Sequence, residues 1–166
     1  MTDRRQDLEK LNRLVHGIRI AMLVTVDEDG RLRSRPMATQ EIDEQGQLWF
    51  FTGASSHKID EVRGNRQVNV AYADADAQKY VSLSGPGTLV RDRAKIDELW
   101  KPAYKAWFPD GKDDPDIALL RVDVEKAEYW DVPGGTMVVL FEYAKNLLTG
   151  KPFEADRNQK IDFLQT

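Results

Sequence analysis

The feature that most constrains the fold is a change of hydrophobic period near residue 20. Before it, Leu8, Leu11 and Leu14 recur at helical spacing, which predicts an amphipathic helix over Asp3–His16 that Gly17 ends. After it, short runs of β-branched and aromatic residues alternate with turn residues, as in strands. Because strands and helices do not alternate along the chain, this order favours an antiparallel sheet over a doubly wound one.

Seven short segments have the composition of strands: residues 20–26, 32–41, 48–52, 67–73, 80–90, 117–124 and 127–132. The turns Asp27–Gly30 and Asp43–Gly46 predict that the first three form an antiparallel meander, with the second strand paired to the third. The run Gly85-Pro86-Gly87 predicts a bulge or bend inside the fifth. The predicted class is mainly β: a small antiparallel barrel of about six to seven strands with flanking helices.

The remaining elements complete one domain. Helical patterns are predicted over His57–Arg63, Ala94–Lys105 and Met137–Leu148, and Pro102 is expected to disturb the end of the second. A chain of 166 residues suits a single core. The expected division is therefore one domain over residues 1–150 and a polar tail over residues 151–166.

Composition excludes several classes of protein. The chain has no cysteine, so thiol catalysis, disulfides and thiolate metal sites are excluded, and its two histidines argue against a transition-metal centre. A net charge of -4 argues against a general nucleic-acid surface. The polar N-terminus and the lack of a long apolar run predict no membrane segment and a cytoplasmic location.

The segment RLRSRPMA, residues 31–38, poses the main functional question. In a strand, Arg31, Arg33 and Arg35 share one face, because alternate side chains point to the same side. Such a face is either simply solvated or a place where an anion binds. Since the whole chain is acidic, an anion site has to be local.

The segment GASSHK, residues 53–58, offers a second basic element. Ser55 and Ser56 precede a predicted helix, whose first amides and positive dipole end, together with Lys58, suit a phosphate group. Plain capping of the helix by serine is the simpler interpretation of this stretch alone. If the strand before it pairs with the arginine strand, Arg33 or Arg35 converges on Lys58, which favours a phosphate site.

An aromatic group lies in residues 100–111. Trp100, Trp107 and Phe108 suit helix and loop packing, but they also suit a wall for a flat ligand or a subunit interface. Trp130 at the end of a strand allows the same two interpretations. The acidic loop Asp110–Asp116 lacks the spacing of a calcium loop and is predicted to be solvated.

Taken in order, these motifs resemble a known family. The strand RSRPMA, the strand LWFFT, SSHK opening a helix, YVSLSG, AWFPDGKDDPD and AEYWD are similar to the general stress protein 26 group, over roughly Leu11–Gly135. That group belongs to the pyridoxamine 5'-phosphate oxidase-like FMN-binding split barrels. The resemblance implies a split β-barrel homodimer with FMN at each of two subunit interfaces.

The resemblance also implies roles for individual residues. It implies that the strand segment Arg35, Pro36, Met37, Ala38 and Thr39 runs beside the flavin ring and ribityl chain, with Arg35 on the phosphate. It also implies flavin contacts from Phe51 and Thr52 on the next strand, and a phosphate-binding helix start at Ser56, His57 and Lys58. Tyr80 would approach the flavin from the barrel, and Trp130 would approach it across the interface. His57 replaces a family arginine and is a weaker, pH-dependent donor.

One departure from the pattern bears on the reaction. The true oxidases follow the tryptophan with a basic segment that grips pyridoxal phosphate, whereas here Trp130 is followed by Asp131 and an uncharged run. The expected function is therefore an FMN-binding stress-type protein, as an oxidoreductase of unknown substrate with NADPH or NADH as a possible donor, and not a pyridoxamine phosphate oxidase. The alternatives are a flavin-binding or stress-sensing module without turnover, and a related barrel that binds haem or deazaflavin.

Overall fold

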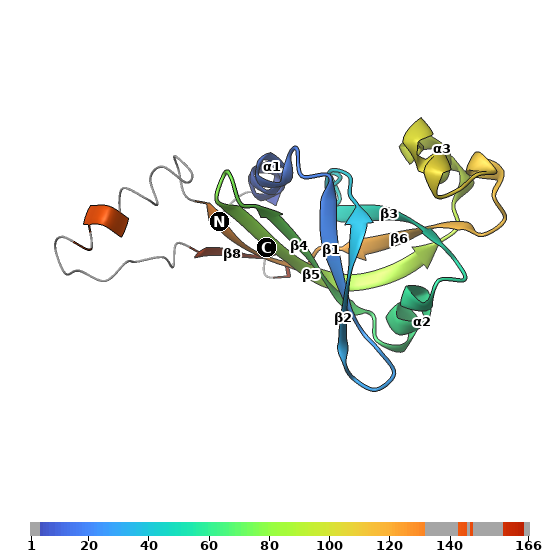
Figure 1. Ribbon diagram of the computed structural model, residues 1–166, viewed down its shortest axis with the longest axis horizontal. Coiled ribbons are helices and arrows are strands. Elements are labelled where there is room, and N and C mark those ends of the chain that lie inside the picture. Colours follow the sequence, from blue (N-terminus) through green and yellow to red (C-terminus); the bar gives the residue numbers. More distant parts are fainter. Residues whose placement is uncertain (1–3, 132–142, 146, 148–157, 165–166) are drawn as a thin grey trace.

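The computed structural model describes residues 4–131, 143–145, 147 and 158–164, and Figure 1 shows their arrangement. The elements whose bounds the structure gives are three α-helices, two short 3-10 helices and eight strands, and residues 143–145 and 147 are helical as well. In chain order they are α1 (Arg4–Val15), β1 (Ile20–Val26), β2 (Leu32–Ala38), β3 (Gln47–Gly53), α2 (His57–Gly64), β4 (Gln67–Asp74), β5 (Lys79–Val90), α3 (Arg93–Leu99), η1 (Pro102–Ala106), η2 (Gly111–Asp113), β6 (Ile117–Asp123), β7 (Lys126–Asp131) and β8 (Asn158–Asp162).

The strands form one curled antiparallel sheet in the order β2-β1-β4-β5-β6-β3, with β7 on β5 and β8 on β7. The predicted mainly β class, a half-barrel with flanking helices, is confirmed. β5 joins the two halves of the sheet, because its first part pairs with β4 and β7 and its last part, Gly87–Val90, pairs with β6. The predicted bend at Gly85–Gly87 lies at this change of partners.

The predicted pairing of the second strand with the third is wrong. β3 pairs along its whole length with β6, and β2 pairs only with β1. After β2 the chain does not turn back, because the Asn12 side chain on α1 holds both backbone groups of Ile42. Thus β2 and β3 are the two ends of the curled sheet, and the barrel is split between them.

Two other predicted boundaries differ. The helix expected over Ala94–Lys105 is divided into α3 and η1, because the backbone before Pro102 is extended, as the ring of a proline requires of the residue before it. Asn158–Asp162, placed in the polar tail, forms β8 against β7. The helix predicted over Met137–Leu148 lies mostly outside the described residues.

The core has two parts. The larger fills the curled sheet and is closed by the apolar stripe of α1, namely Leu8, Leu11, Leu14 and Val15. The smaller lies between β3, β6 and the segment that carries α3 and η1, with Trp49, Ile96, Tyr104 and Leu119 among its members. The second core fixes that segment beside the split in the barrel. None of the helices within the described ranges is long and apolar enough to cross a membrane.

Candidate functional site

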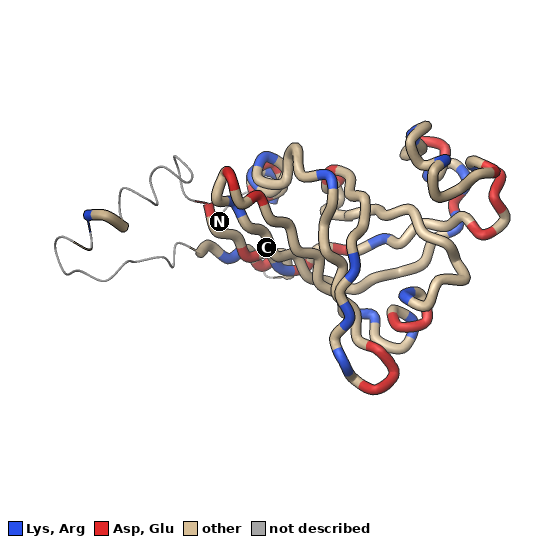
Figure 2. The backbone as a smooth tube through the Cα atoms, in the orientation of Figure 1, with Lys and Arg blue, Asp and Glu red and all other residues tan. Residues whose placement is uncertain are grey.

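The arginines of β2 point toward α2. Arg33 and Arg35 stand opposite Thr25 and Leu23 of β1, both of which are fully buried, so they lie on the inner face of the sheet. Figure 2 shows basic residues along the length of β2 and acidic residues at the β1–β2 turn. Arg33 Nε donates to Asp27 Oδ2 of this turn at 3.0 Å. This pair engages Arg33 and leaves Arg35 as the better candidate for an anion.

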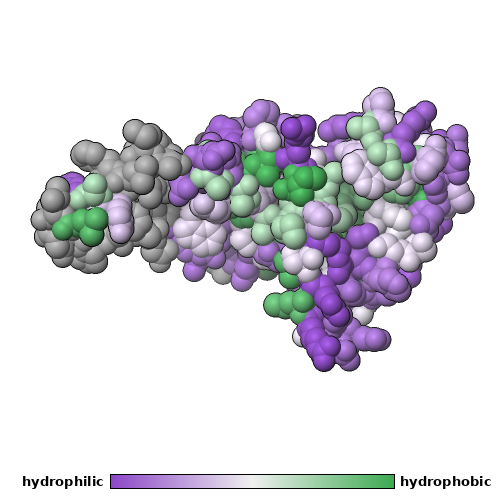
Figure 3. All heavy atoms as spheres, in the orientation of Figure 1, coloured by the Kyte–Doolittle hydropathy of each residue, from purple (hydrophilic) through white to green (hydrophobic). Residues whose placement is uncertain are grey.

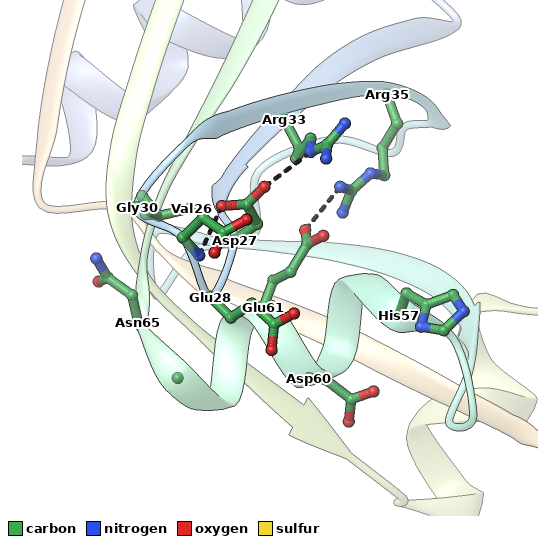
Figure 4. A pocket seen from close by; sticks show the side chains of 12 residues that line it. Val26, Asp27, Glu28, Gly30, Arg33, Arg35, His57, Asp60, Glu61 and Asn65 are labelled. Carbon is green, nitrogen blue, oxygen red and sulfur yellow. Dashed lines mark hydrogen bonds and ion pairs between the residues drawn. The ribbon is translucent and has the colours of Figure 1, made fainter.

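Of the two terminal nitrogens of Arg35, only one has a hydrogen-bond partner among the described residues. Its Nη2 donates to Glu61 Oε2 on α2 at 2.7 Å, whereas its Nη1 is buried without a hydrogen-bond partner among the residues that the structure describes. A buried donor left unpaired costs about 1–3 kcal/mol. Figure 4 shows Arg33 and Arg35 side by side above α2, each joined to its carboxylate. The free Nη1 is therefore a donor for which an anionic ligand would compensate.

Lys58 lies in the first turn of α2. Its Nζ donates to Thr52 Oγ1 on β3 at 3.0 Å and to Ser56 Oγ, in the residue before the helix, at 2.7 Å. Burial lowers the pKa of the Lys58 amine, and the positive charge of Arg35 lowers it further. The predicted convergence of Arg35 and Lys58 thus occurs, but across the split of the barrel and not through a hairpin.

The loop before α2 is held by Asp116, a residue that the sequence analysis assigned to a solvated loop. Its carboxylate accepts from the Ser55 amide at 2.9 Å and the Ser55 hydroxyl at 2.8 Å, and its carbonyl accepts from the Ala54 amide. The Ser55 hydroxyl and amide, in that order, lower the pKa of the Asp116 carboxyl. No pattern in the sequence marks this role, which depends on a contact between residues 61 positions apart.

These elements surround a pocket of about 590 Å³ at the split. Its basic end carries Arg35 and Lys58, and its other walls are the end of β2, the end of β3 and the segment between β5 and β6. That segment contributes Tyr104, Trp107 and Phe108, and the Tyr104 ring packs 4.7 Å from the Phe51 ring, centroid to centroid. Trp107 is 66% exposed at the edge. The rings of this aromatic group thus pack against one another and also line the pocket.

The structure brings most of the predicted site residues together. Seven of them line this pocket: Arg35, Pro36, Met37, Ala38, Phe51, Thr52 and Lys58. Ser56 contacts it through Lys58, and Thr39 Oγ1 bonds the buried Tyr72 hydroxyl at 2.7 Å. Burial raises the pKa of Tyr72 to about 12. Tyr80 and Trp130 do not line it: they face each other across β5 and β7.

A second pocket, of about 810 Å³, adjoins the first (Figure 4). It lies between the β1–β2 turn and α2, and it is lined by His57 and by charged residues, mostly acidic: Asp27, Glu28, Asp29, Arg33, Arg35, Asp60 and Glu61. Arg35 belongs to the walls of both pockets. Within the described part of the chain, no group of three or more His, Asp or Glu residues is placed to hold a metal ion.

Known proteins resemble this chain in sequence and in fold. The chain is 26% identical to protein bli-3 of Neurospora crassa over 94% of this chain and 79% of that protein. Among solved structures, a putative general stress protein 26 from Jannaschia sp. has a TM-score of 0.74 at 28% identity, covering 95% of this chain and 99% of that one. The general stress FMN/FAD binding protein of Xanthomonas citri has a TM-score of 0.64 at 35% identity, covering 76% and 89%.

The family described as pyridoxamine 5'-phosphate oxidase like matches residues 6–154, which is most of the chain. The resemblance on which the site residues were predicted is confirmed by this match and by the relatives named general stress protein 26. The split strand order and the basic end of the pocket agree with this match. Because the match covers most of the chain, this protein belongs to the pyridoxamine 5'-phosphate oxidase-like family.

Proposed function

We propose that this protein binds FMN in the pocket between β2 and β3, with the phosphate at Arg35 and Lys58. The observation that carries the proposal is the pair of cations at one end of the pocket, one with a buried unpaired donor and the other with a pKa lowered by burial. Two partly desolvated cations side by side repel each other, and the carboxylates of Glu61 and Asp116 offset this repulsion only in part, since the pKa of Lys58 is still lowered. A phosphate dianion has the charge and the acceptor oxygens to offset the rest.

The rest of the pocket suits the flavin ring. Beyond the two cations, β2, β3 and the segment between β5 and β6 contribute apolar and aromatic walls, with Pro36, Met37, Phe51, Tyr104 and Trp107 among them, and Asp114 and Asp116 add two carboxylates. Pro36 lies on the free edge of β2, where a residue without an amide hydrogen costs no pairing. The second pocket is predominantly acidic and is the less favourable place for a phosphate.

The proposal includes a homodimer. On the outer face of the sheet, β1 exposes Ile20 and Met22, and the register places Pro36 and Ala71 beside Met22. Figure 3 shows hydrophobic residues gathered over this part of the molecule. Because Ile20 and Pro36 also line the pocket, a second copy covering this face would close the pocket as well.

The same face explains why Tyr80 and Trp130 do not line the pocket of their own chain. The register from Ala71 to Ser82, and from Tyr80 to Trp130, places both aromatic residues on the outer face. In the proposed dimer they would approach the flavin bound to the partner.

Flavin, when bound, supplies hydride chemistry, and the protein would bind the phosphate, orient the ring and limit the access of water. We further propose a flavin-dependent oxidoreductase.

The experiment is a titration of the purified protein with FMN and riboflavin, followed by anaerobic mixing with NADPH or NADH. Saturable binding that is at least tenfold tighter for FMN than for riboflavin is expected from about 1.4 kcal/mol of phosphate recognition. Equal affinities would refute the phosphate site, and an FMN-loaded protein whose flavin is not reduced would be a binding module.

A further inference from the structure

Arg35 is a long side chain whose direction has to be fixed if it is to meet a phosphate. It has four rotatable bonds, and it is 23% exposed at the edge of a split sheet, where β2 has no second neighbouring strand. An arginine in that position loses side-chain freedom when it binds a ligand, unless the protein has already restricted it. The structure shows a device that restricts it.

That device begins at Thr25, in the middle of β1. The residue is fully buried, and its Oγ1 donates to Glu61 Oε2 at 2.5 Å. Threonine is branched at Cβ, so its hydroxyl has few allowed positions on a strand. A buried hydroxyl with a single strong acceptor is well suited to fixing the place of that acceptor.

The same carboxylate oxygen also receives Arg35. Glu61 Oε2 accepts from Arg35 Nη2 at 2.7 Å, so the position of the guanidinium follows from the position set by Thr25. Desolvation raises the pKa of the Glu61 carboxyl, but the hydrogen bonds from Thr25 and Arg35 outweigh it and the pKa is lowered. Glu61 is thus ionised at neutral pH, and Nη1 is the guanidinium nitrogen that stays buried without a partner among the described residues.

We propose that Thr25 and Glu61 are positioning residues that hold Arg35 for a phosphate and so set the preference for a phosphorylated flavin over an unphosphorylated one. The inference rests on the proposed function. It goes beyond it in assigning selectivity to two residues that do not line the ring pocket. The negative charge of Glu61 does not defeat this role, because its ion pair with Arg35 Nη2 offsets that charge and leaves Nη1 unbonded to any described residue.

The test is the ratio of the dissociation constants for riboflavin and FMN. Thr25→Val keeps the shape of the side chain and removes its donor. We expect it to reduce this ratio about three- to tenfold, which is the size of one ordinary hydrogen bond, because Thr25 acts on the phosphate only through the position of Arg35. Affinity for riboflavin should stay within about twofold, because no contact to the ring changes. Thr25→Ser restores the donor and should restore the ratio.

A second variant guards against a folding defect at the buried Thr25. Glu61→Ala removes the shared acceptor from α2 without altering the buried residue of β1, and it should reduce the ratio at least as much as Thr25→Val. An unchanged ratio in both variants overturns the inference. A ratio that increases in Glu61→Ala also overturns it, since Glu61 would then be a competitor of the phosphate. A wild-type ratio near one would instead refute the phosphate site itself.

Discussion

At the scale of single residues, the site combines charges that are individually unfavourable. Lys58 shows this directly, because burial and then Arg35 lower the pKa of its amine from the usual 10.5. A lysine whose pKa falls on folding binds its proton less tightly in the folded state than in the unfolded state. It therefore destabilises the fold at pH values below its folded-state pKa, and this effect disappears as the pH rises past 10.5, where the amine is neutral in both states. At neutral pH, Lys58 therefore reduces stability in the absence of a ligand.

Replacing Lys58 should separate stability from binding. We expect Lys58→Met to leave the melting temperature of the flavin-free protein unchanged or slightly higher, because a desolvated charge is removed. The affinity for FMN should fall about ten- to a hundredfold and that for riboflavin should not, since a charge-assisted contact is worth about 1.5–3 kcal/mol. Thermal unfolding and flavin titration measure the two effects, and Lys105→Met on exposed η1 is the control. An equal loss for both flavins would contradict the assigned role.

At the scale of elements, the bend in β5 depends on one close approach. A Cβ on Gly85 would lie 1.8 Å from the carbonyl oxygen of Asp123, a backbone atom that cannot move without displacing the end of β6. This contact lies where β5 changes from β4 to β6 as its partner.

We therefore expect Gly85→Ala to reduce the free energy of unfolding by about 3 kcal/mol or more, in the range of severe backbone clashes and overpacking. Denaturant unfolding followed by circular dichroism measures it. Gly64→Ala at the end of α2 is the matched control, because its Cβ would meet no atom within 4 Å, and it should change stability by less than about 1 kcal/mol. Equal stability of the two variants would contradict this expectation, because the end of β6 would then move away from the added Cβ at little cost in free energy.

The same scale shows what the sequence could predict. Strands such as β1 and β4 were predictable, since their alternation is local. The partner of β3 was not, because β6 lies far along the chain and the path after β2 is set by Asn12. β8 has one apolar residue, Ile161, and is a strand through pairing with β7. Likewise the loop with Asp116 was predicted to be solvated and no motif marked Glu61, and only their distant partners reveal the roles of these two carboxylates.

At the scale of the whole molecule, the proposed dimer predicts that two chains share each site. Arg35→Ala and Trp130→Ala homodimers should each bind FMN weakly, the latter because a buried aromatic contact can carry 2 kcal/mol or more, roughly thirtyfold. In a mixed dimer with one substitution on each chain, one site carries both changes and the other neither. We expect half of the wild-type FMN stoichiometry at high affinity, measured after co-expression with two affinity tags. Light scattering that finds only a 19.0 kDa species at micromolar concentration would contradict the dimer.

The last prediction concerns a reaction of the family's namesake. Oxidation of pyridoxamine phosphate requires cations for a second phosphate over the flavin, because an unpaired dianion is costly to remove from water. After Trp130 the sequence offers Asp131 and then Val132, Pro133 and two glycines, and the Asp131 carboxylate already accepts from Lys10 Nζ at 3.1 Å. Lys10, a cation beside that end of β7, is therefore already engaged by a carboxylate. We expect FMN-loaded protein to form no pyridoxal phosphate above the rate with free FMN, measured by absorbance of the product. Saturable turnover would contradict this, and loss of that turnover in Lys79→Met, opposite Asp131 on β5, would then locate the clamp.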